Sequence, residues 1–513
     1  MTENYLNILA ETIRNNRDQP ALTDFYLTED GTAQDTSRGN HYTYGEMYAE
    51  FCRVANLLTS LGLQKGDHIA ICGANSAHWV IAYLAIAKMQ GVSVTVMRTL
   101  MPDEIAHMVN FSDAKALFVD EDLWKELSPL HRPILGALSS VISLDNWSIL
   151  KGEDIKISND QCQMSNREVG FSPVEPDSLA MICFTSGTSG KAKGVMSPIR
   201  GISNNINATL SFFPHDKNPN YIAFLPFAHM SGIMGELLPQ LVIHRHIYIC
   251  KEIYSLEGFK DAIEICKPYL IISVPKLYAG LLNKYGDYVL ELFQRTCKLL
   301  CIGGALLDEK TEKHLDHAHI PIGIVYGLTE TTAEISLSPY GGHRMKSVGK
   351  IVSGMTCRIS PVGEILVKGE NVMLGYYKDP EATAAKIDSD GWLHTGDKGH
   401  LDEDGYLYVE GRLEQDIIVL PNGENIRPDN IESLINALPE VSESIVLARD
   451  GKLVAIVVPS SPLALGEGQG VRLLVLRAVN PQLPLFSQLY DVEISDTPLQ
   501  RTEKQTIKRY LYK

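Results

Sequence analysis

Helix-periodic segments alternate with short apolar runs along two stretches of the chain, and this alternation limits the fold more than any other feature. In the first stretch, Tyr44–Leu61 and Ser76–Met89 have helical periodicity, whereas His68–Cys72 and Val92–Val96 have the pattern of strands. The pattern returns after Val174, where we predict strands at Leu179–Phe184, Tyr221–Leu225, Ile247–Cys250, Leu270–Val274 and Lys298–Ile302. Such an order favours a mostly parallel sheet covered by helices.

The last third of the chain has a different sequence pattern. Beyond about Ser347, short strands and Gly turns predict an antiparallel sheet or a small barrel, and from Pro428 onward the pattern predicts a small α+β unit. We place the main boundary near Gly411–Gln415. The predicted fold is therefore α/β, with a large N-terminal domain (1–411) that includes a β-barrel-like subdomain from about 347, and a small mobile C-terminal domain (412–513).

Charge and cysteine content exclude several classes of protein. The 46 basic and 62 acidic side chains give a net charge of −16, which argues against a general affinity for nucleic acid or anionic membranes but permits a local phosphate site. The nine Cys include no CxxC pair, so we expect reduced thiols and a cytoplasmic protein. Met1–Arg14 lacks the pattern of a secretory signal, and Ala74–Met97 is too often interrupted to span a bilayer. Peripheral membrane contact stays open.

The segment Phe184–Gly194 directly follows an apolar strand and is rich in groups that bind anions. Its candidate residues are Thr185, Ser186, Gly187, Thr188, Ser189, Gly190, Lys191 and Lys193. Glycine lets backbone N–H groups approach an anion, hydroxyls add donors, and lysine supplies a positive charge. Two residues rather than four separate Gly187 from Gly190, so this is not a Walker A loop. We interpret it as a triphosphate cradle; a plain Gly/Ser/Thr loop is the alternative.

A second polar turn follows the apolar run Ile322–Val325. Its residues Tyr326, Gly327, Leu328, Thr329 and Glu330 bring an aromatic ring, a hydroxyl and a carboxylate to the end of a strand, where ligands gather in open α/β sheets. A helix start with Thr329 as N-cap and Glu330 in the first turn is a compatible interpretation.

Three further motifs complete the set: Gly391–Asp397, Gly411–Ile418 and Pro421–Pro428. Together and in this order, the motifs resemble those of the ANL superfamily of adenylate-forming enzymes, which includes acyl-CoA synthetases, the adenylation domains of peptide synthetases, and luciferases. The resemblance extends from Tyr42 to Arg509. Met101–Ala106 and Leu225–His229 are most similar to the long-chain acyl-CoA synthetase branch.

The resemblance implies a nucleotide-binding role for each matching residue. It assigns Thr185–Lys193 to the β- and γ-phosphates, and the segment Gly303, Gly304 and Ala305 to the adenine. It further assigns adenine stacking to Tyr326, α-phosphate contact to Thr329, Mg²⁺ binding to Glu330, ribose binding to Asp397, and ribose or phosphate binding to Arg412. Hard carboxylate oxygens suit Mg²⁺ in any case.

The resemblance also implies that the small domain moves. Glu414 matches the hinge about which that domain rotates between adenylation and thioester formation. A moving lid makes physical sense, because one site cannot hold pyrophosphate and admit a thiol at once. Gly423, Glu424 and Asn425 would line the pantetheine path; as an alternative, Asn422–Gly423 is a common hairpin turn.

One motif departs from the pattern of the superfamily. Its last motif places a Lys where this chain has Thr506, aligned on Arg501–Thr502 and Ile507–Arg509. That Lys bridges the substrate carboxylate and the α-phosphate, and losing such a donor typically costs about 10²–10³ in rate. Lys504 lies two residues away and is the candidate replacement.

Histidine occurs in two places that invite a functional interpretation. His314, His317 and His319 lie among charged residues, so we expect a solvated helix end rather than a zinc site. His229 matches a position beside the acyl carboxylate, with a core histidine as the alternative.

The expected activity is ATP-dependent activation of a carboxylic acid, a medium- or long-chain fatty acid, followed by transfer to coenzyme A. The expected ligands are the acid, ATP, Mg²⁺ and CoA. The candidate catalytic residues are Thr185, Lys193, His229, Thr329, Glu330 and Lys504. A carrier-protein phosphopantetheine as acyl acceptor, or a catalytically impaired nucleotide- or acyl-binding protein, stays open as an alternative; chain length of the acid and oligomeric state carry no local signature.

Overall fold

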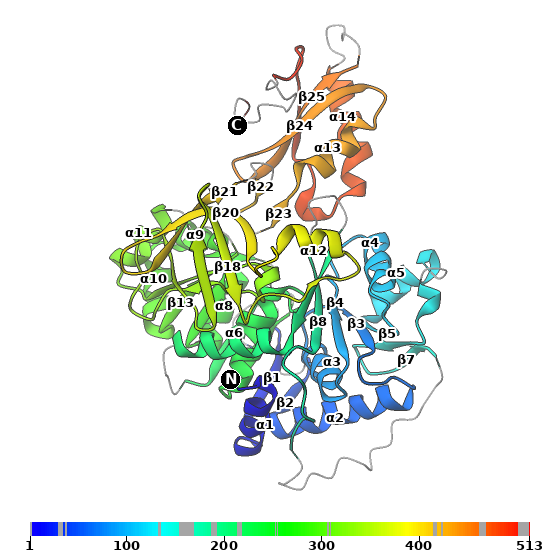
Figure 1. Ribbon diagram of the computed structural model, residues 1–513, viewed down its shortest axis with the longest axis vertical. Helices are drawn as coiled ribbons and strands as arrows, with labels where there is room; N and C mark the ends of the chain where they lie inside the picture. Colours follow the sequence, from blue (N-terminus) through cyan, green and yellow to red (C-terminus); the bar gives the residue numbers. More distant parts are fainter. Residues whose placement is uncertain are drawn as a thin grey trace. The chain divides into compact units, whose positions relative to one another are not determined.

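The computed structural model describes residues 3–512, apart from 29–33, 36–37, 132–134, 153–168, 186–191, 213–217, 252, 254, 305–306, 308, 414–417, 422–423, 461–467 and 501–511. The chain forms two compact units (Figure 1). The large unit consists of Met1–Arg98, Pro102–Thr185 and Lys193–Gly411, and the small unit contains Arg412–Lys513. The predicted α/β class, with a large N-terminal and a small C-terminal part, is confirmed.

An eight-stranded sheet forms the first half of the large unit, in the order β19-β9-β8-β4-β3-β5-β6-β7. Its bounds are β3 His68–Cys72, β4 Val92–Thr95, β5 Ala116–Val119, β6 Ser140–Ser143, β7 Ile149–Lys151, β8 Leu179–Thr185, β9 Lys193–Pro198 and β19 Gly375–Tyr376. The five central strands, β8 to β6, are parallel, and antiparallel strands close both edges. The predicted mostly parallel sheet is confirmed.

The helices of this half follow the predicted pattern. They are α1 Tyr5–Asn15, α2 Tyr44–Ser60, α3 Ala77–Lys88, α4 Pro102–Phe111, α5 Glu121–His131 and α6 Ile199–Phe212. Thr43 and Glu46 form a capping box that starts α2, and the Ser76 side chain accepts from Trp79 N–H to start α3. Because α3 is apolar on every side, it can only be stable when protein surrounds it.

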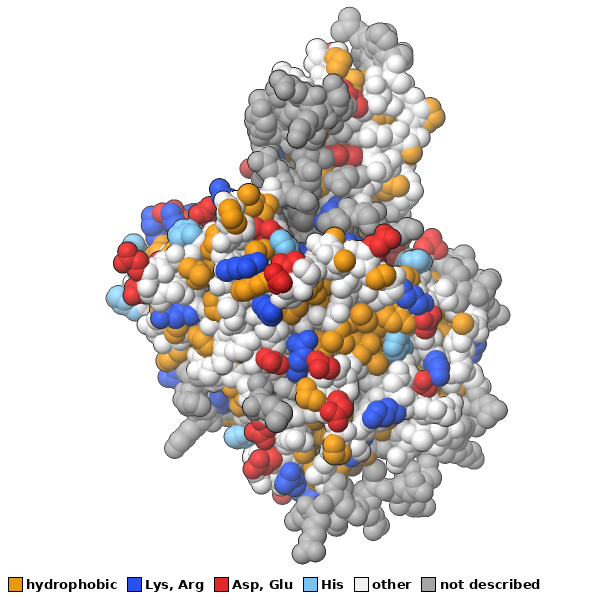
Figure 2. Space-filling view, in the orientation of Figure 1, with side chains coloured by type: hydrophobic (Ala, Val, Ile, Leu, Met, Phe, Trp, Pro, Cys, Tyr) orange, Lys and Arg blue, Asp and Glu red, His pale blue; other side chains and the backbone are white. Residues whose placement is uncertain are grey.

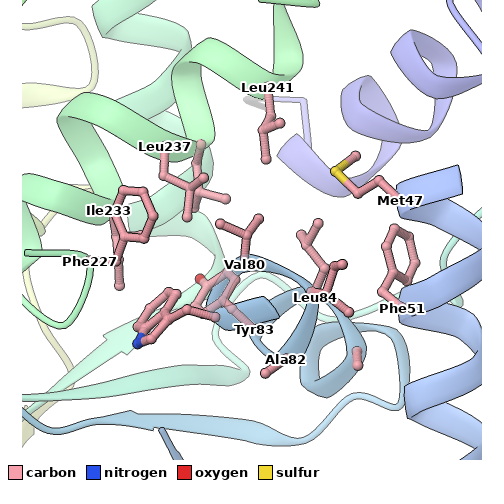
Figure 3. Packing of buried hydrophobic residues seen from close by; sticks show 14 of the residues in the cluster. Met47, Phe51, Val80, Ala82, Tyr83, Leu84, Phe227, Ile233, Leu237 and Leu241 are labelled. Carbon is pink, nitrogen blue, oxygen red and sulfur yellow. The ribbon is translucent and has the colours of Figure 1, made fainter. Parts of the chain in front are cut away.

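Figure 3 shows how α3 is enclosed. Its Val80, Tyr83 and Leu84 lie between Met47 and Phe51 of α2 and the apolar residues Phe227, Ile233, Leu237 and Leu241. The last three belong to a one-turn π-helix, η3 (Gly232–Leu237), and the helix α7 (Leu238–Val242) that continues it. This core therefore joins α3 to the segment that carries His229.

A four-stranded sheet has the order β10-β11-β1-β2 and the bounds β1 Pro20–Phe25, β2 His41–Thr43, β10 Asn220–Ala223 and β11 His246–Cys250. A nine-stranded sheet has the order β12-β13-β14-β15-β16-β21-β20-β18-β17. Its bounds are β12 Leu270–Ser273, β13 Leu299–Ile302, β14 Ile322–Tyr326, β15 Ser336–Leu337, β16 Ser347–Ile351, β17 Met355–Ile359, β18 Glu364–Gly369, β20 Leu393–Leu401 and β21 Tyr406–Arg412.

The β-rich segment after Ser347 is the antiparallel half of this nine-stranded sheet. Strands β12, β13 and β14 are parallel, and β15 turns the sheet into an antiparallel array. Of the two predicted alternatives, the antiparallel sheet is therefore the better description. The remaining helices of the large unit are α8 Leu256–Cys266, α9 Pro275–Tyr285, α10 Asp287–Thr296, α11 Glu309–His317 and α12 Pro380–Lys386. Figure 1 shows α8, α9 and α10 grouped near β13.

The small unit has its own core. It contains β22 Ile418–Val419, β23 Asn425–Ile426, α13 Pro428–Asn436, β24 Val441–Arg449, β25 Lys452–Pro459, α14 Gly468–Val479 and β26 Asp491–Ile494. Apolar side chains of both helices, among them Ile431 of α13 and Val475 of α14, share one core with strand residues such as Val446 of β24. The predicted small α+β unit is confirmed.

Three further properties of the described residues are the surface charge, the state of the cysteines and the hydrophobicity of the helices. On the face shown in Figure 2, acidic and basic side chains of the large unit are interspersed, so the negative charge is not gathered into one patch there. Seven cysteines in the described part of the chain are free thiols: Cys72, Cys183, Cys250, Cys266, Cys297, Cys301 and Cys357. Burial raises the pKa of each of them, in the case of Cys183 to about 11. Every helix in the described part of the chain falls short of the length and apolar content that a bilayer crossing demands.

Candidate active site

The predicted phosphate loop connects the two strands of a β-hairpin. Thr185 ends β8 and Lys193 begins β9, and the two residues are paired across the hairpin. Because β8 also pairs in parallel with β4, Thr185 lies at the carboxyl edge of the parallel strands. The loop residues Ser186, Gly187, Thr188, Ser189, Gly190 and Lys191 lie outside the described residues.

The second predicted motif is a tight turn after β14. Gly327 is required there, because a Cβ at this position would lie 1.9 Å from the backbone oxygen of Ala333. A single 3₁₀ turn, η4 (Thr329–Thr331), follows, and Thr332 then adopts a left-handed conformation with φ 47°. Leu328, not Thr329, occupies the N-cap position, so the interpretation of Thr329 as a helix N-cap is wrong.

Tyr376 contacts residues of both motifs. Its hydroxyl donates to Glu330 Oε1 at 2.7 Å, and the ammonium of Lys193 lies 4.9 Å from the centre of its ring. Such a position over the ring face is a cation–π contact. The structure thus brings the lysine at the base of the hairpin and the carboxylate of the β14 turn to two parts of one aromatic side chain, which sequence analysis had not singled out. Its sequence context, a Gly-Tyr pair after a strand, carries no distinctive signal.

Tyr326 and Asp397 form a second pair, 71 residues apart in the chain. The Tyr326 hydroxyl donates to Asp397 Oδ2 at 2.6 Å, and Asp397 on β20 is almost entirely buried, with 4% exposure. Gly303 and Gly304 follow the neighbouring strand β13, and a Cβ on Gly303 would lie 3.4 Å from the Val325 oxygen. Gly303 therefore lies beside the end of β14, and a Cβ on Gly304 would lie 3.6 Å from Val274. Ala305 lies outside the described residues.

A buried polar network supports the β14 turn from behind. Asn205 of α6 donates to the Thr332 oxygen at 2.6 Å, and Thr209 of the same helix donates to Glu334 Oε1 at 2.6 Å. Burial raises the pKa of Glu334 to about 8, since desolvation disfavours the charged form and the Thr209 hydrogen bond offsets this only in part. Because α6 directly continues β9, this network ties the phosphate hairpin to the β14 turn. A run of polar residues in the middle of α6 is the sequence signal for it.

The loop after β10 carries His229, whose side chain is exposed and whose Nδ1 lies 2.8 Å from Ser231 Oγ. Its exposure argues against the core-histidine alternative. Protein nevertheless surrounds the ring closely, and this desolvation lowers its pKa. The ring is therefore neutral at neutral pH.

Two side chains, the half-buried Asn75 and the buried Glu236, hold the backbone of that loop. Asn75 Oδ1 accepts from Phe227 N–H at 2.8 Å, and its Nδ2 donates to the Leu225 oxygen at 2.7 Å. Glu236, on η3, accepts from the N–H groups of Phe224 and Leu225 at 2.9 and 2.6 Å. Burial raises the pKa of Glu236 well above its usual range, because the side chain has no exposed surface. A π-helix often marks a functional site; Asn75 and Glu236 have no local sequence signal.

In the small unit, fewer candidates can be described. The backbone of Arg412 ends β21, whereas its side chain and Glu414 lie outside the described residues. Strands β22 and β23 form the hairpin predicted around Asn422–Gly423, with Glu424 accepting from Leu420 N–H at 2.9 Å through its backbone oxygen. Burial raises the pKa of the Glu424 side chain, while Asn425 is exposed. Gly423, Lys504 and Thr506 also lie outside the described residues.

The donor set suits a cation bound together with phosphates. Among the described residues, no three His, Cys, Asp or Glu side chains gather into a group that could hold a metal ion by themselves. Glu330 alone offers a hard carboxylate oxygen at the β14 turn, and Mg²⁺ is typically held by one or two carboxylates with substrate phosphates and water. The residues therefore fit Mg²⁺ as part of a metal–triphosphate complex. His314, His317 and His319 are exposed at and beyond the end of α11.

Comparison with known proteins identifies the family. The profile of the AMP-binding enzyme family matches residues 9–377, and that of the AMP-binding enzyme C-terminal domain matches residues 415–512. This chain belongs to the AMP-binding enzyme family. The predicted membership of the superfamily of adenylate-forming enzymes is thereby confirmed.

Curated relatives of this AMP-binding enzyme are named as CoA ligases of different acids. Long-chain-fatty-acid–CoA ligase FadD15 of Mycobacterium bovis is 25% identical over 89% of this chain and 82% of its own length. The 2-succinylbenzoate–CoA ligase of Oceanobacillus iheyensis is 27% identical, over 86% and 89% of the two chains.

Solved structures share the fold. The o-succinylbenzoate CoA synthetase of Bacillus subtilis bound with a product analogue has a TM-score of 0.77 at 24% identity, covering 99% of this chain and 98% of that one. The amide bond synthetase McbA of Marinactinospora thermotolerans has a TM-score of 0.78 at 22% identity, with 98% of each chain covered.

Proposed function

We propose that the protein is an ATP-dependent acyl-CoA synthetase that acts on a medium- or long-chain fatty acid. In the first step the acid's carboxylate oxygen attacks the α-phosphorus of ATP, the bond to the bridging oxygen breaks, and pyrophosphate leaves. In the second step the sulfur of coenzyme A attacks the carbonyl carbon of the acyl-adenylate, the thiol proton is lost to a base, and AMP leaves. The first step makes the acyl carbon reactive, because adenylate is a far better leaving group than oxide.

The observation that carries this proposal is that Lys193 and Glu330 both contact the side chain of Tyr376. Adenylation needs positive charge near the triphosphate and a carboxylate for its metal, and needs little else but positioning. Lys193 provides the charge at the root of the hydroxyl-rich hairpin, where Thr185 pairs with it. Mg²⁺, when bound through Glu330, would offset negative charge on the phosphates.

The other predicted residues have places that suit the same reaction. Asp397, held by Tyr326, would accept from the ribose hydroxyls, with the Tyr326 ring, Gly303 and Gly304 beside the adenine. Thr329 at the start of η4 would contact the α-phosphate. A neutral His229 could donate a hydrogen bond to the substrate carboxylate.

For thioester formation we propose the roles that the resemblance implies for the small unit. Rotation of the small unit about Glu414 would turn a different face of that unit toward the bound substrate in each of the two steps. Arg412 would contact the nucleotide, and the pantetheine path would be lined by Gly423, Glu424 and Asn425. Fatty acids are proposed as substrates because Met101–Ala106 and Leu225–His229 resemble the long-chain branch and because a fatty-acid ligase is among the relatives.

The test is AMP release from ATP across a panel of carboxylic acids of different length and ring content, with and without CoA. We expect AMP release that needs both acid and CoA and is fastest with a fatty acid. Release that is highest with an aromatic acid would overturn the fatty-acid assignment. Acid-dependent pyrophosphate release without a response to CoA would point instead to a carrier-bound pantetheine, and ATP binding without any AMP would point to an impaired homologue.

Thr506 makes the role of Lys504 a separate question. We propose that Lys504 supplies the charge that the superfamily places at position 506. The variant Lys504→Ala is then expected to slow acid-dependent pyrophosphate release by about 10²–10³. An unchanged rate would end this proposal. Thr506→Lys is the matched variant, and it should restore activity to Lys504→Ala if both positions reach the same phosphate.

A further inference from the structure

Two elements of the candidate site come from different sheets, and one short segment joins them. The hairpin β8–β9 belongs to the eight-stranded sheet, whereas the β14 turn belongs to the nine-stranded sheet. The segment Met373–Tyr377 contacts both. Met373 N–H donates to the Glu330 oxygen at 2.9 Å, and Tyr377 N–H donates to the Gly194 oxygen at 2.8 Å.

Within this segment, Tyr376 is firmly oriented. Strand β19 pairs with β9, so that Tyr376 lies opposite Val195. Its N–H donates to Thr383 Oγ1 at 2.9 Å, and its side chain is buried, with 6% exposure. A Cβ on Gly375, which has φ +138°, would lie 2.8 Å from the Thr383 side chain, so glycine is needed just before the tyrosine. The ring therefore cannot turn away from its neighbours without disturbing β19.

The hydroxyl and the ring face of Tyr376 contact groups of opposite charge. The hydroxyl donates to Glu330 Oε1, which leaves Oε2 for another partner. The ring face carries the Lys193 ammonium at 4.9 Å. A phenol placed in this way keeps a carboxylate and an ammonium apart, although they attract each other and could otherwise pair directly. Both charges then stay available to a ligand.

We propose that Tyr376 is a positioning residue of the nucleotide site: it orients Glu330 toward the metal of a Mg²⁺–triphosphate complex and holds Lys193 toward the phosphates. This inference rests on the proposed function and adds a residue to it. Tyr376 does not itself touch the reacting atoms. It acts as residues do that hydrogen-bond to a metal ligand without touching the metal. Losing such a hydrogen-bond partner typically lowers metal affinity or activity about 10- to 100-fold.

The two contacts of Tyr376 can be separated by substitution. Tyr376→Phe removes the hydrogen bond to Glu330 and keeps the ring under Lys193, whereas Tyr376→Leu removes both. Tyr377→Phe is the matched control, because the Tyr377 hydroxyl also donates to a carboxylate, Asp113 Oδ2 at 2.8 Å, but at an exposed position. Thermal unfolding of each variant shows whether it is folded.

The measurement is the equilibrium affinity for ATP by calorimetry, in saturating MgCl₂ and in EDTA. For Tyr376→Phe we expect the gain in affinity due to Mg²⁺ to fall about tenfold, with the affinity in EDTA unchanged. Tyr376→Leu should also weaken binding in EDTA, since Lys193 is no longer held. Tyr377→Phe should match the wild type in both solutions. In turnover, Tyr376→Phe should need more Mg²⁺ for half-maximal AMP release.

Three results would overturn the inference: an unchanged Mg²⁺-dependent gain in Tyr376→Phe, an equal loss in both solutions, or a wild-type affinity for ATP that does not respond to Mg²⁺. A wild-type protein that binds ATP with Mg²⁺ but releases no AMP with any acid would overturn the proposed function and leave this inference standing. A wild-type protein that binds no ATP would overturn both.

Discussion

The loop that follows β10 and the turn that follows β14 both leave the carboxyl end of a parallel strand, yet they present opposite chemistry. The β14 turn presents a carboxylate, Glu330, held by a tyrosine hydroxyl. The β10 loop presents a histidine, His229, whose pKa is lowered by desolvation from the surrounding protein. In the roles proposed above, Glu330 would bind the metal of the nucleotide and His229 would donate to the substrate carboxylate. The two regions therefore differ in the charge that they offer to a ligand.

The supports of the two regions differ as well. Glu236 holds the β10 loop through backbone N–H groups, whereas Glu334 behind the β14 turn accepts from a side-chain hydroxyl of α6. Both carboxyl groups are buried, and burial raises both pKa values. We therefore expect the half-buried carboxylate of Glu330 to govern catalysis and the buried carboxyl groups to govern stability.

Glu330→Gln should have the largest effect. It keeps the size of the side chain and removes the charge that the metal–triphosphate complex needs. We expect kcat/KM for AMP release to fall by about 10²–10³, with the unfolding midpoint unchanged. Glu381→Gln, on the exposed start of α12, is the control. Full activity in Glu330→Gln would break the comparison.

Asp397→Asn should have a smaller effect, confined to ATP. The amide oxygen can still accept from Tyr326, but the charge-assisted hydrogen bonds proposed between Asp397 and the ribose would be lost, which costs about 1.5–3 kcal/mol. We expect KM for ATP to rise at least tenfold while KM for the acid stays the same. Asp404→Asn serves as the control, since Asp404 is an exposed partner of Arg344. A change in KM for the acid alone would contradict the assignment.

Glu334 should make stability depend on pH. Its pKa in the folded protein, about 8, lies above its ordinary value, so the folded state keeps a proton that the unfolded state has released. The contribution of Glu334 to the free energy of unfolding is therefore full when the pH is below the ordinary glutamate pKa. It is lost as the pH rises through 8, at no more than about 1.4 kcal/mol per pH unit. Urea unfolding at several pH values should show a flatter profile for Glu334→Gln. Parallel profiles for the two proteins would show that Glu334 is not protonated.

Glu236→Gln should have the smallest effect. Because the native side chain is neutral, an amide oxygen can accept the same two N–H bonds, and we expect a change in unfolding free energy within about 0.5 kcal/mol. Glu236→Ala leaves both N–H groups unsatisfied and should cost about 1–3 kcal/mol. If Glu236→Gln is as damaging as Glu236→Ala, the side chain acts through its charge, and the contrast between the half-buried Glu330 and the buried carboxyl groups fails.

Much of the architecture was predictable because it depends on local patterns. The helices α2 and α3 and the strands β3, β4 and β8 follow from periodicity and capping residues within a few positions of each other. The Gly327 turn is likewise visible as a polar motif after an apolar run. The internal geometry of this turn was not predictable. A single 3₁₀ turn forms where a helix with Thr329 as N-cap had been an alternative, because Thr332 adopts a left-handed conformation and ends the turn.

The sequence by itself determined which chemical groups are available, the order of the motifs, and hence the family. Only the tertiary structure decided which of these groups meet. Tyr376 and Glu330 are 46 residues apart, Tyr326 and Asp397 are 71 apart, and Asn75 and Phe227 are 152 apart. Such contacts depend on which strands are neighbours in two different sheets, and strand order is a property of the whole chain that no local pattern encodes.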